Sequence, residues 1–209
     1  MEKYRSFFIL VGIVLSFITT TKVFADVQWP PRLGHAFPDD ITYIDQEGES
    51  IKLSDFKGSV FLVEYVGMNC PACQAFSGAN KKSIGPFENN AVQQGLDSLE
   101  KYCPLYAQGI SLDDKRFIFI QVLLYDRMMR APKSNDAKRW AEHFRYKKEN
   151  LQYVLVPDRD MRSPASYNLI PGFQLIDKNF IVRSDSTGHH PNDNLYLTLL
   201  PMLSKLLDE

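Results

Sequence analysis

The feature that most constrains this chain is a pair of cysteines, Cys70 and Cys73, that directly follows a strand-like run. Residues 59–66 (SVFLVEYV) are almost continuously apolar and rich in β-branched and aromatic residues, as is typical of a short strand buried on both faces. The residues after Pro71, ACQAFSGANKK, suit a helix, because proline is tolerated in a first helical turn. The cysteines therefore lie at a strand-to-helix junction, where a redox couple, half of a metal site and a structural staple are all open interpretations.

The N-terminal residues have the three parts of a secretory signal peptide. Lys3 and Arg5 give a basic start, an apolar run of twelve residues spans 7–18, and Val23 and Ala25 occupy the −3 and −1 positions of a cleavage site. A bilayer span needs roughly 20 apolar residues, so the run is short for a membrane helix. We expect residues 1–25 to be removed and a mature domain of residues 26–209 to be exported, most simply into a bacterial periplasm. An uncleaved anchor is the alternative, and only then would the protein contact a membrane.

Composition narrows the class of protein further. The chain has 209 residues, 44% of them hydrophobic and 23% charged, which predicts one globular domain with a sizeable core. The formal net charge of −1 gives no reason to expect nucleic acid as a partner. Three cysteines are too few for a disulfide scaffold, and an oxidising compartment favours disulfide chemistry at a C-x-x-C motif.

Strand-like and helix-like segments alternate along the mature chain, which predicts an α/β sandwich with parallel central strands. The expected strands are a hairpin over 41–56 that turns at Gly48, followed by 59–66, 116–125, 151–157, 170–177 and 179–185, of which the last two are close enough to form an antiparallel hairpin. The expected helices are 72–82, 88–106, 134–144, 163–168 and 192–209. Ser134 is the expected N-cap of its helix, and Pro201 should kink or divide the last one. The helix over 88–106 would carry an apolar stripe of Val92, Leu96, Leu99 and Cys103.

Several separate stretches resemble the thioredoxin-like superfamily, and within it the exported TlpA/AhpC-TSA (redoxin) type of thiol–disulfide oxidoreductase. Residues 33–66 are similar to the start of that family, with a Gly-x-x-x-Pro lead, a hairpin and the sequence LSDFKG before the first central strand. C-P-A-C opens the next helix, and LIPGFQLIDKNFIV (169–182) resembles the family's cis-proline strand and the hairpin beyond it. The resemblance covers most of 33–207. It implies a thioredoxin-like three-layer sandwich with a mixed central sheet, an N-terminal β-hairpin and a helical insertion after the active-site helix.

The chain departs from the family pattern at two places. Asn69 directly precedes the first cysteine, where the family usually has tryptophan. The stretch 77–115 is longer than usual and carries Cys103. Both departures concern which partner is bound more than which fold is adopted.

The position of Cys70 favours a reactive thiol. The thiolate is the nucleophilic form of cysteine, and an unperturbed thiol titrates near about pH 8.5. A helix N-terminus places unpaired N–H groups and about half a positive charge beside the sulfur, which lowers its pKa. We therefore expect Cys70 to be the nucleophile and Cys73, one turn further into the helix, to be the resolving thiol.

Glu64 is a carboxylate inside the apolar run, where burial costs several kcal/mol unless the group has a partner. It lies six residues before Cys70, where thioredoxins carry a buried aspartate that exchanges protons with the second thiol. The resemblance therefore implies that Glu64 accepts the proton of Cys73. An exposed strand position or a lysine partner is the alternative.

The resemblance also supplies the expected substrate-binding residues. It implies that Pro171 is a cis-proline that faces the cysteines, with the backbone of Ile170 free to pair with an extended substrate segment. Asn69, Pro71 and Ala72, around the first cysteine, complete this set.

Three further residues have two interpretations each. Cys103 could be a third redox thiol or an intermolecular link, but its place on an apolar stripe favours a buried core thiol. His189 and His190 could join the cysteines in a metal site, but turn histidines without a ligand role are the favoured interpretation.

The leading functional hypothesis is an exported thiol–disulfide oxidoreductase, most simply a reductase of periplasmic protein disulfides through a Cys70–Cys73 couple. Its partners would be protein thiols and disulfides and an upstream redox partner such as a membrane reductase, and it would need no cofactor. The alternative is a copper or other metal carrier that uses Cys70, Cys73 and a histidine. A peroxiredoxin-type peroxidase is disfavoured, because Val63 and Gly67 stand where proline and Ser/Thr are expected. The dipeptide between the cysteines does not fix the direction of electron flow.

Overall fold

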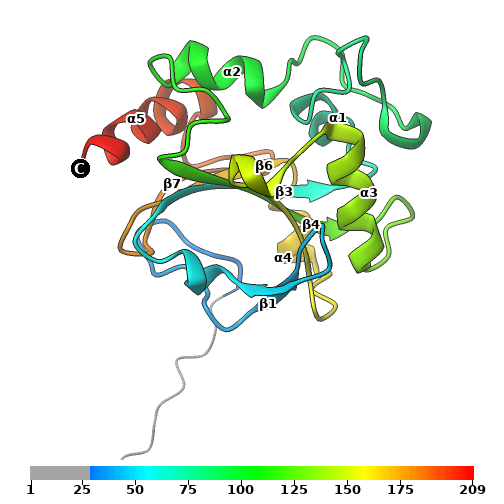
Figure 1. Ribbon diagram of the computed structural model, residues 1–209, viewed down its shortest axis with the longest axis horizontal. Coiled ribbons are helices and arrows are strands. Elements are labelled where there is room, and N and C mark those ends of the chain that lie inside the picture. The colour runs from blue at the N-terminus through cyan, green and yellow to red at the C-terminus, as the bar shows by residue number, and fades with distance from the viewer. Residues whose placement is uncertain (1–28) are drawn as a thin grey trace, which may run out of the picture.

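A seven-stranded mixed sheet organises the computed structural model, which describes residues 29–209 (Figure 1). The strand order is β2-β1-β5-β4-β3-β6-β7. The expected signal peptide and its cleavage site lie outside the described residues.

The centre of the sheet is formed by three parallel strands, β3 (Val60–Gly67), β4 (Phe117–Tyr125) and β5 (Gln152–Pro157). Every residue of β3 and β4 is buried, which is why both strands appear in the sequence as continuous apolar runs rather than as alternating patterns. The parallel centre was predicted from the sequence and is confirmed.

Antiparallel hairpins complete both edges of the sheet. The N-terminal hairpin joins β1 (Thr42–Ile44) and β2 (Ser50–Lys52), and the C-terminal hairpin joins β6 (Gly172–Ile176) and β7 (Val182–Thr187). Because β6 runs antiparallel to β3, the sheet is mixed, as expected. The register places Glu64 of β3 between Gln121 of β4 and Phe173 of β6.

Apolar side chains fill both faces of the sheet. Successive residues of β3 alternate between two clusters, with Phe61 and Val63 in one and Val60 and Leu62 in the other. The five α-helices described over 29–209 are α1 (Pro71–Phe76), α2 (Leu99–Tyr106), α3 (Ser134–Phe144), α4 (Pro164–Tyr167) and α5 (Leu200–Asp208). Figure 1 shows α2 and α5 beside each other on one side of the sheet. Trp140 of α3 lies in the cluster with Phe61, so helices cover both faces and give the three-layer sandwich that the resemblance implied.

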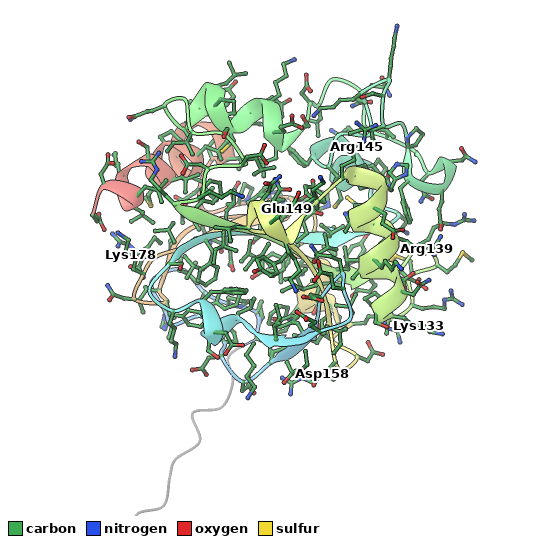
Figure 2. The ribbon with its side chains drawn as sticks, viewed as in Figure 1. Lys133, Arg139, Arg145, Glu149, Asp158 and Lys178 are labelled. Carbon is green, nitrogen blue, oxygen red and sulfur yellow. The ribbon has the colours of Figure 1, made fainter. Side chains whose placement is uncertain are left out.

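Short helical turns connect these elements: η1 (Leu53–Phe56), η2 (Phe87–Asn89), η3 (Lys148–Asn150) and the π-helical turn η4 (Leu195–Leu199). The C-terminal helix is divided, as expected, and Pro201 lies in the first turn of α5, where its missing N–H costs nothing. Many charged side chains lie on the surface, among them Lys133, Arg139 and Asp158, which Figure 2 labels, whereas Glu64 is fully buried.

Three expectations about helices are wrong. The helix expected over 72–82 ends at Phe76, because Gly78 turns the chain with φ +105°. The helix N-cap expected at Ser134 is the preceding Lys133, whose N–H donates to the Asp136 carboxylate at 2.8 Å.

The single helix expected over 88–106 is the third error. Only its second half is α-helical, as α2, and the expected helical insertion is otherwise irregular apart from the short turn η2. Glu88 and Gly95 have φ of +50° and +82°, which a regular α-helix cannot contain. The Asn80 side chain donates to the carbonyls of Gln93 and Leu96 at 3.0 and 2.7 Å, so these backbone groups are committed to a loop.

Candidate active site

The two cysteines lie where β3 passes into α1. Cys70 is the N-cap of α1, and its sulfur accepts a hydrogen bond from the Cys73 backbone N–H at 3.2 Å. Pro71 occupies the first turn, where it sets the helical φ without leaving a donor unsatisfied. The buried amide of Gln74 donates to the Met68 carbonyl at 2.7 Å and so ties α1 to the segment that carries Cys70. All three cysteines are free thiols.

The environment of Cys70 favours the thiolate. The pKa of its thiol is lowered, first because the Cys73 thiol is hydrogen-bonded to its sulfur and further because the N–H groups of Cys73 and Ala72 point at it. Burial opposes these effects, but Cys70 is only half-buried. A thiolate that remains accessible is the form that can attack a disulfide.

The environment of Cys73 favours the protonated thiol. Its side chain is fully buried, and its thiol donates to the Tyr65 carbonyl at the long distance of 4.0 Å. Burial raises the pKa of Cys73 well above its ordinary value, and the neighbouring Cys70 and Glu64 add to this rise. Cys73 therefore needs a base before it can act as a nucleophile.

Glu64 is fully buried on β3, so neither the exposed position nor the lysine partner weighed from the sequence is found. Gln121 Nε2 donates to its Oε2 at 2.6 Å, whereas its Oε1 has no hydrogen-bond partner. Burial raises the pKa of Glu64 from 4.5 to about 8, although the bond from Gln121 opposes the rise. A carboxyl group with this pKa can accept or release a proton near neutral pH.

Pro171 and the residues around Cys70 enclose a cavity of about 220 Å³. The Ile170–Pro171 peptide bond is cis. Asn69 and Pro71 also line the cavity, whereas Ala72 is buried in the apolar cluster beneath α2 and α5.

The backbone of Ile170 is only partly available for pairing. Its N–H donates to the Tyr167 carbonyl at 3.1 Å, which leaves the Ile170 carbonyl as the candidate group for pairing with a substrate.

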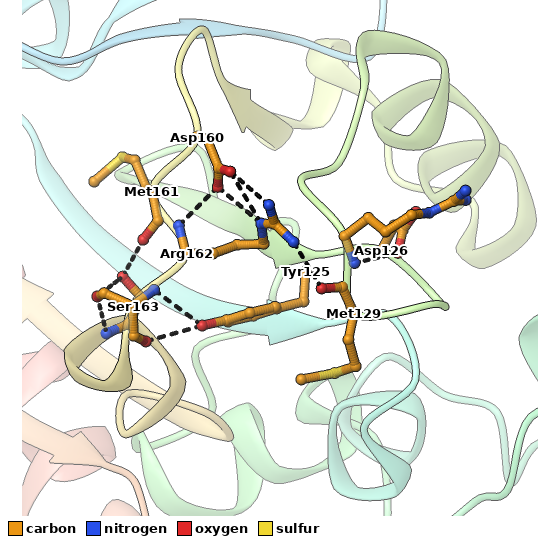
Figure 3. A network of polar contacts seen from close by, with 9 residues as sticks. Tyr125, Asp126, Met129, Asp160, Met161, Arg162 and Ser163 are labelled. Carbon is orange, nitrogen blue, oxygen red and sulfur yellow. Dashed lines mark hydrogen bonds and ion pairs between the residues drawn. The ribbon is translucent and has the colours of Figure 1, made fainter.

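Tyr125 and Met129 line the same cavity and were not identified from the sequence. Figure 3 shows the polar network that holds them: the Tyr125 hydroxyl donates to the Ser163 carbonyl at 2.9 Å and accepts from the Ser163 N–H at 3.2 Å. Arg162 pairs with Asp160 and donates to the Met129 carbonyl at 3.1 Å. Tyr125 is the last residue of β4, and binding sites of α/β proteins lie at the carboxyl ends of parallel strands. Its position in the sequence could therefore have identified it as a candidate site residue.

The turn after β4 places Met129 in the cavity beside Cys70 and leaves its neighbour Met128 exposed. The Asp126 carboxylate accepts from the N–H groups of Met128 and Arg130, both at 2.8 Å, and pairs with the Arg130 side chain. Met128 and Met129 keep 62% and 39% of their surface exposed. Exposed methionines are adaptable contacts for a variable partner.

Cys103 lies in the core, as favoured from the sequence. Its side chain is fully buried in the cluster with Leu99 and Leu203, and burial raises its pKa to about 12. A thiol in this environment is unreactive at neutral pH.

The histidines do not complete a metal site. His189 lines the cavity beside Cys70, and both His189 and His190 are exposed. Over residues 29–209, however, no three His, Cys, Asp or Glu side chains are close enough to hold a metal ion together. The described residues therefore offer no group of three metal ligands in support of the metal-carrier hypothesis.

Comparison with known proteins identifies the fold. No protein-family model matches the chain, and no curated protein matches it in sequence. A proposed electron transfer protein from Aquifex aeolicus is 15% identical with a TM-score of 0.56, over 85% of this chain and 99% of that one. A proposed protein disulfide isomerase from Bacteroides thetaiotaomicron is 16% identical with a TM-score of 0.52, over 86% and 92% of the two chains. The expected thioredoxin-like fold is confirmed.

Proposed function

We propose that this chain, with its thioredoxin-like fold, is a thiol–disulfide oxidoreductase whose redox couple is Cys70 and Cys73. The observation that carries the proposal is the contrast between the two thiols. Cys70 is partly exposed and its sulfur accepts backbone and side-chain hydrogen bonds, whereas Cys73 is buried one turn away beside Glu64. This division suits one nucleophile and one resolving thiol.

The reaction has two exchange steps. The Cys70 thiolate attacks one sulfur of a client disulfide, a mixed disulfide forms, and the other client sulfur leaves as a thiolate. Cys73 then loses its proton to Glu64 and attacks Cys70 Sγ. The Cys70–Cys73 disulfide forms, the second client thiolate leaves, and two electrons have passed from the protein to the client.

The client is proposed to be a protein. The surface beside Cys70 is apolar, with Met129, Tyr167 and Pro171 lining the cavity. A hollow of about 820 Å³ that shares His189 with this cavity extends along Leu33 and Asn168 and offers room for an extended chain.

We further propose that the protein is exported and acts as a reductase that an upstream partner recharges. The proposal of export rests on the pattern of residues 1–25. None of the helices described over 29–209 is long and apolar enough to cross a lipid bilayer.

Trapping of the mixed disulfide tests the proposed roles. Cys73→Ser should retain the attack by Cys70 but accumulate a stable mixed disulfide with a disulfide-bonded client protein, whereas Cys70→Ser should form none. Cys103→Ser is the matched control, since its thiol is buried in the core, and should turn over like the wild type. Trapping by Cys70→Ser, or none by Cys73→Ser, would overturn the assignment.

A further inference from the structure

Gln121 is the neighbour of Glu64 in the sheet, and every polar group of its side chain is used. It lies opposite Glu64 in the parallel register of β3 and β4 and is fully buried. Its Nε2 donates to Glu64 Oε2 at 2.6 Å and to Ser77 Oγ at 3.0 Å, and its Oε1 accepts from Trp140 Nε1 at 2.9 Å. The Tyr146 hydroxyl lies 3.4 Å from the same Nε2.

Trp140 decides which end of the Gln121 amide faces Glu64. The indole N–H can only donate, so the amide atom that faces it must be the oxygen. With Oε1 committed to the fully buried Trp140, Nε2 is turned toward Glu64. Rotation of the amide by half a turn would bring two donors together at Trp140 and two acceptors together at Glu64.

The two oxygens of Glu64 are consequently not equivalent. Oε2 receives the Gln121 donor, whereas Oε1 is buried without any hydrogen-bond partner. A buried oxygen without a donor is the less stable place for negative charge, so it is the oxygen on which a proton is held more firmly.

We propose that Gln121, fixed by Trp140, is a positioning residue for Glu64 and makes Oε1 the atom that accepts the proton of Cys73. The inference rests on the proposed function and concerns its second step. Cys73 loses its proton to Glu64 Oε1 as its sulfur attacks Cys70 Sγ. The bond between Cys70 and the client sulfur breaks, and the client leaves as a thiolate.

The hydrogen bond that Gln121 donates to Glu64 also affects how strong a base the carboxylate is. Burial raises the pKa of Glu64 and the bond from Gln121 lowers it, which leaves the pKa at about 8. The pKa of Cys73 is raised well above its ordinary value, so a Glu64 pKa of about 8 leaves the proton transfer from Cys73 uphill, but less so than an unperturbed carboxylate would. The titratable groups that act on Glu64 are Cys70 and Cys73 from α1 and Tyr146 after α3.

Substitutions of Gln121 should move the pH dependence of resolution in opposite directions. Gln121→Met keeps the shape but removes the donor, so the pKa of Glu64 and the pH midpoint of resolution should rise by about one unit or more. Gln121→Lys places a positive charge beside the carboxylate, so the midpoint should fall. Trp140→Phe releases the amide and should shift the midpoint in the same direction as Gln121→Met, by less.

The resolution step can be followed directly in the full-length reduced protein with dithiobis(nitrobenzoic acid). Cys70 releases the first thionitrobenzoate in a bimolecular phase, and Cys73 releases the second in a unimolecular phase, whose rate is measured against pH. Gln174→Met is the matched control: Gln174 is equally buried, but its oxygen accepts from Tyr65 and its nitrogen donates to Pro31, away from Glu64. Its midpoint should equal that of the wild type.

The outcomes separate this inference from the proposed function. Opposite shifts in Gln121→Met and Gln121→Lys, with none in Gln174→Met, support the positioning role. The positioning role would be overturned, with the redox function intact, if the pH midpoint of resolution were unchanged in both Gln121 variants. It would also be overturned if both variants shifted the midpoint in the same direction, in proportion to their loss of folding stability. A wild-type protein that shows no unimolecular phase would instead overturn the function itself. If Gln121→Met does not fold, Trp140→Phe and Gln121→Lys still give the decisive comparison.

Discussion

At the scale of single residues, three buried or half-buried groups have protonation states that suit one another. The pKa of Cys70 is lowered by hydrogen bonds to its sulfur, that of Cys73 is raised by burial, and that of Glu64 is raised to about 8 by burial. A thiolate, a thiol and a carboxyl group near its midpoint are what a two-step exchange requires. Glu64 was found in the sequence because it interrupts an apolar run. Gln121 interrupts β4 in the same way and would have been found by the same rule.

Glu64 should make the protein less stable as the pH rises. Its folded pKa of about 8 lies above its ordinary value of 4.5, so between these values the folded state binds more protons than the unfolded state. Its stabilising contribution is complete below about pH 4.5 and is lost as the pH rises toward 8, by up to about 1.4 kcal/mol per pH unit. We expect Glu64→Gln to flatten this decline.

Chemical denaturation of the oxidised protein between about pH 5 and 9 measures this effect without titration of Cys70 and Cys73. Glu64→Gln should gain stability relative to the wild type as the pH rises. Equal slopes in both proteins would show that the carboxyl group is not held in its protonated form.

At the scale of elements, sequence patterns succeed where burial is regular. The strands β3 and β4 appear as continuous apolar runs because both of their faces are buried, and α3 appears as a stripe because only one face is. The segment 77–98 has no such period. It is held by single contacts from the Asn80 side chain and by positive φ at Glu88, which no hydrophobic pattern encodes.

Asn80→Ala should loosen the loop that replaces the expected helix. The side chain donates two hydrogen bonds to backbone carbonyls, and Asn80 is itself exposed, so the cost should be about 1 kcal/mol with the core intact. Hydrogen exchange should accelerate in residues 90–98 and stay unchanged in β3 and β4. Equal exchange in the two proteins would mean that other contacts define the loop.

Substitution by alanine should destabilise the protein more at Gly172 than at Gly95. A Cβ at Gly172 would lie 2.4 Å from the Leu169 carbonyl oxygen and from Thr187 Cα, both of them backbone atoms next to the cis-proline. A Cβ at Gly95 meets nothing within 4 Å, so alanine there costs only its positive φ, about 1 kcal/mol. Thermal unfolding should show a much larger loss for Gly172→Ala than for Gly95→Ala, and similar losses would contradict the close approach of β6 and β7.

At the scale of the whole molecule, the fold brings together residues that lie far apart in the chain. The site combines the β3–α1 junction, the end of β4 at Tyr125 and the segment before β6 at Pro171. The cysteines, Glu64 and Pro171 were predicted from motif and resemblance. Tyr125 was missed although it ends a central parallel strand, and Met129 could not be predicted, because its place beside Cys70 is held by the Arg162 contact that only the folded chain makes.

The central claim is that Cys70 and Cys73 form one reversible redox couple, and an equilibrium titration with glutathione or dithiothreitol buffers tests it most directly. The wild type and Cys103→Ser should show a single two-electron transition, with a midpoint below about −200 mV if the protein acts as a reductase. Cys70→Ser and Cys73→Ser should each abolish the intramolecular disulfide, and Cys73→Ser should form only a mixed disulfide of Cys70 with glutathione. A wild-type protein that forms no Cys70–Cys73 disulfide at any buffer ratio, or an intramolecular disulfide that survives in Cys73→Ser, would contradict the account.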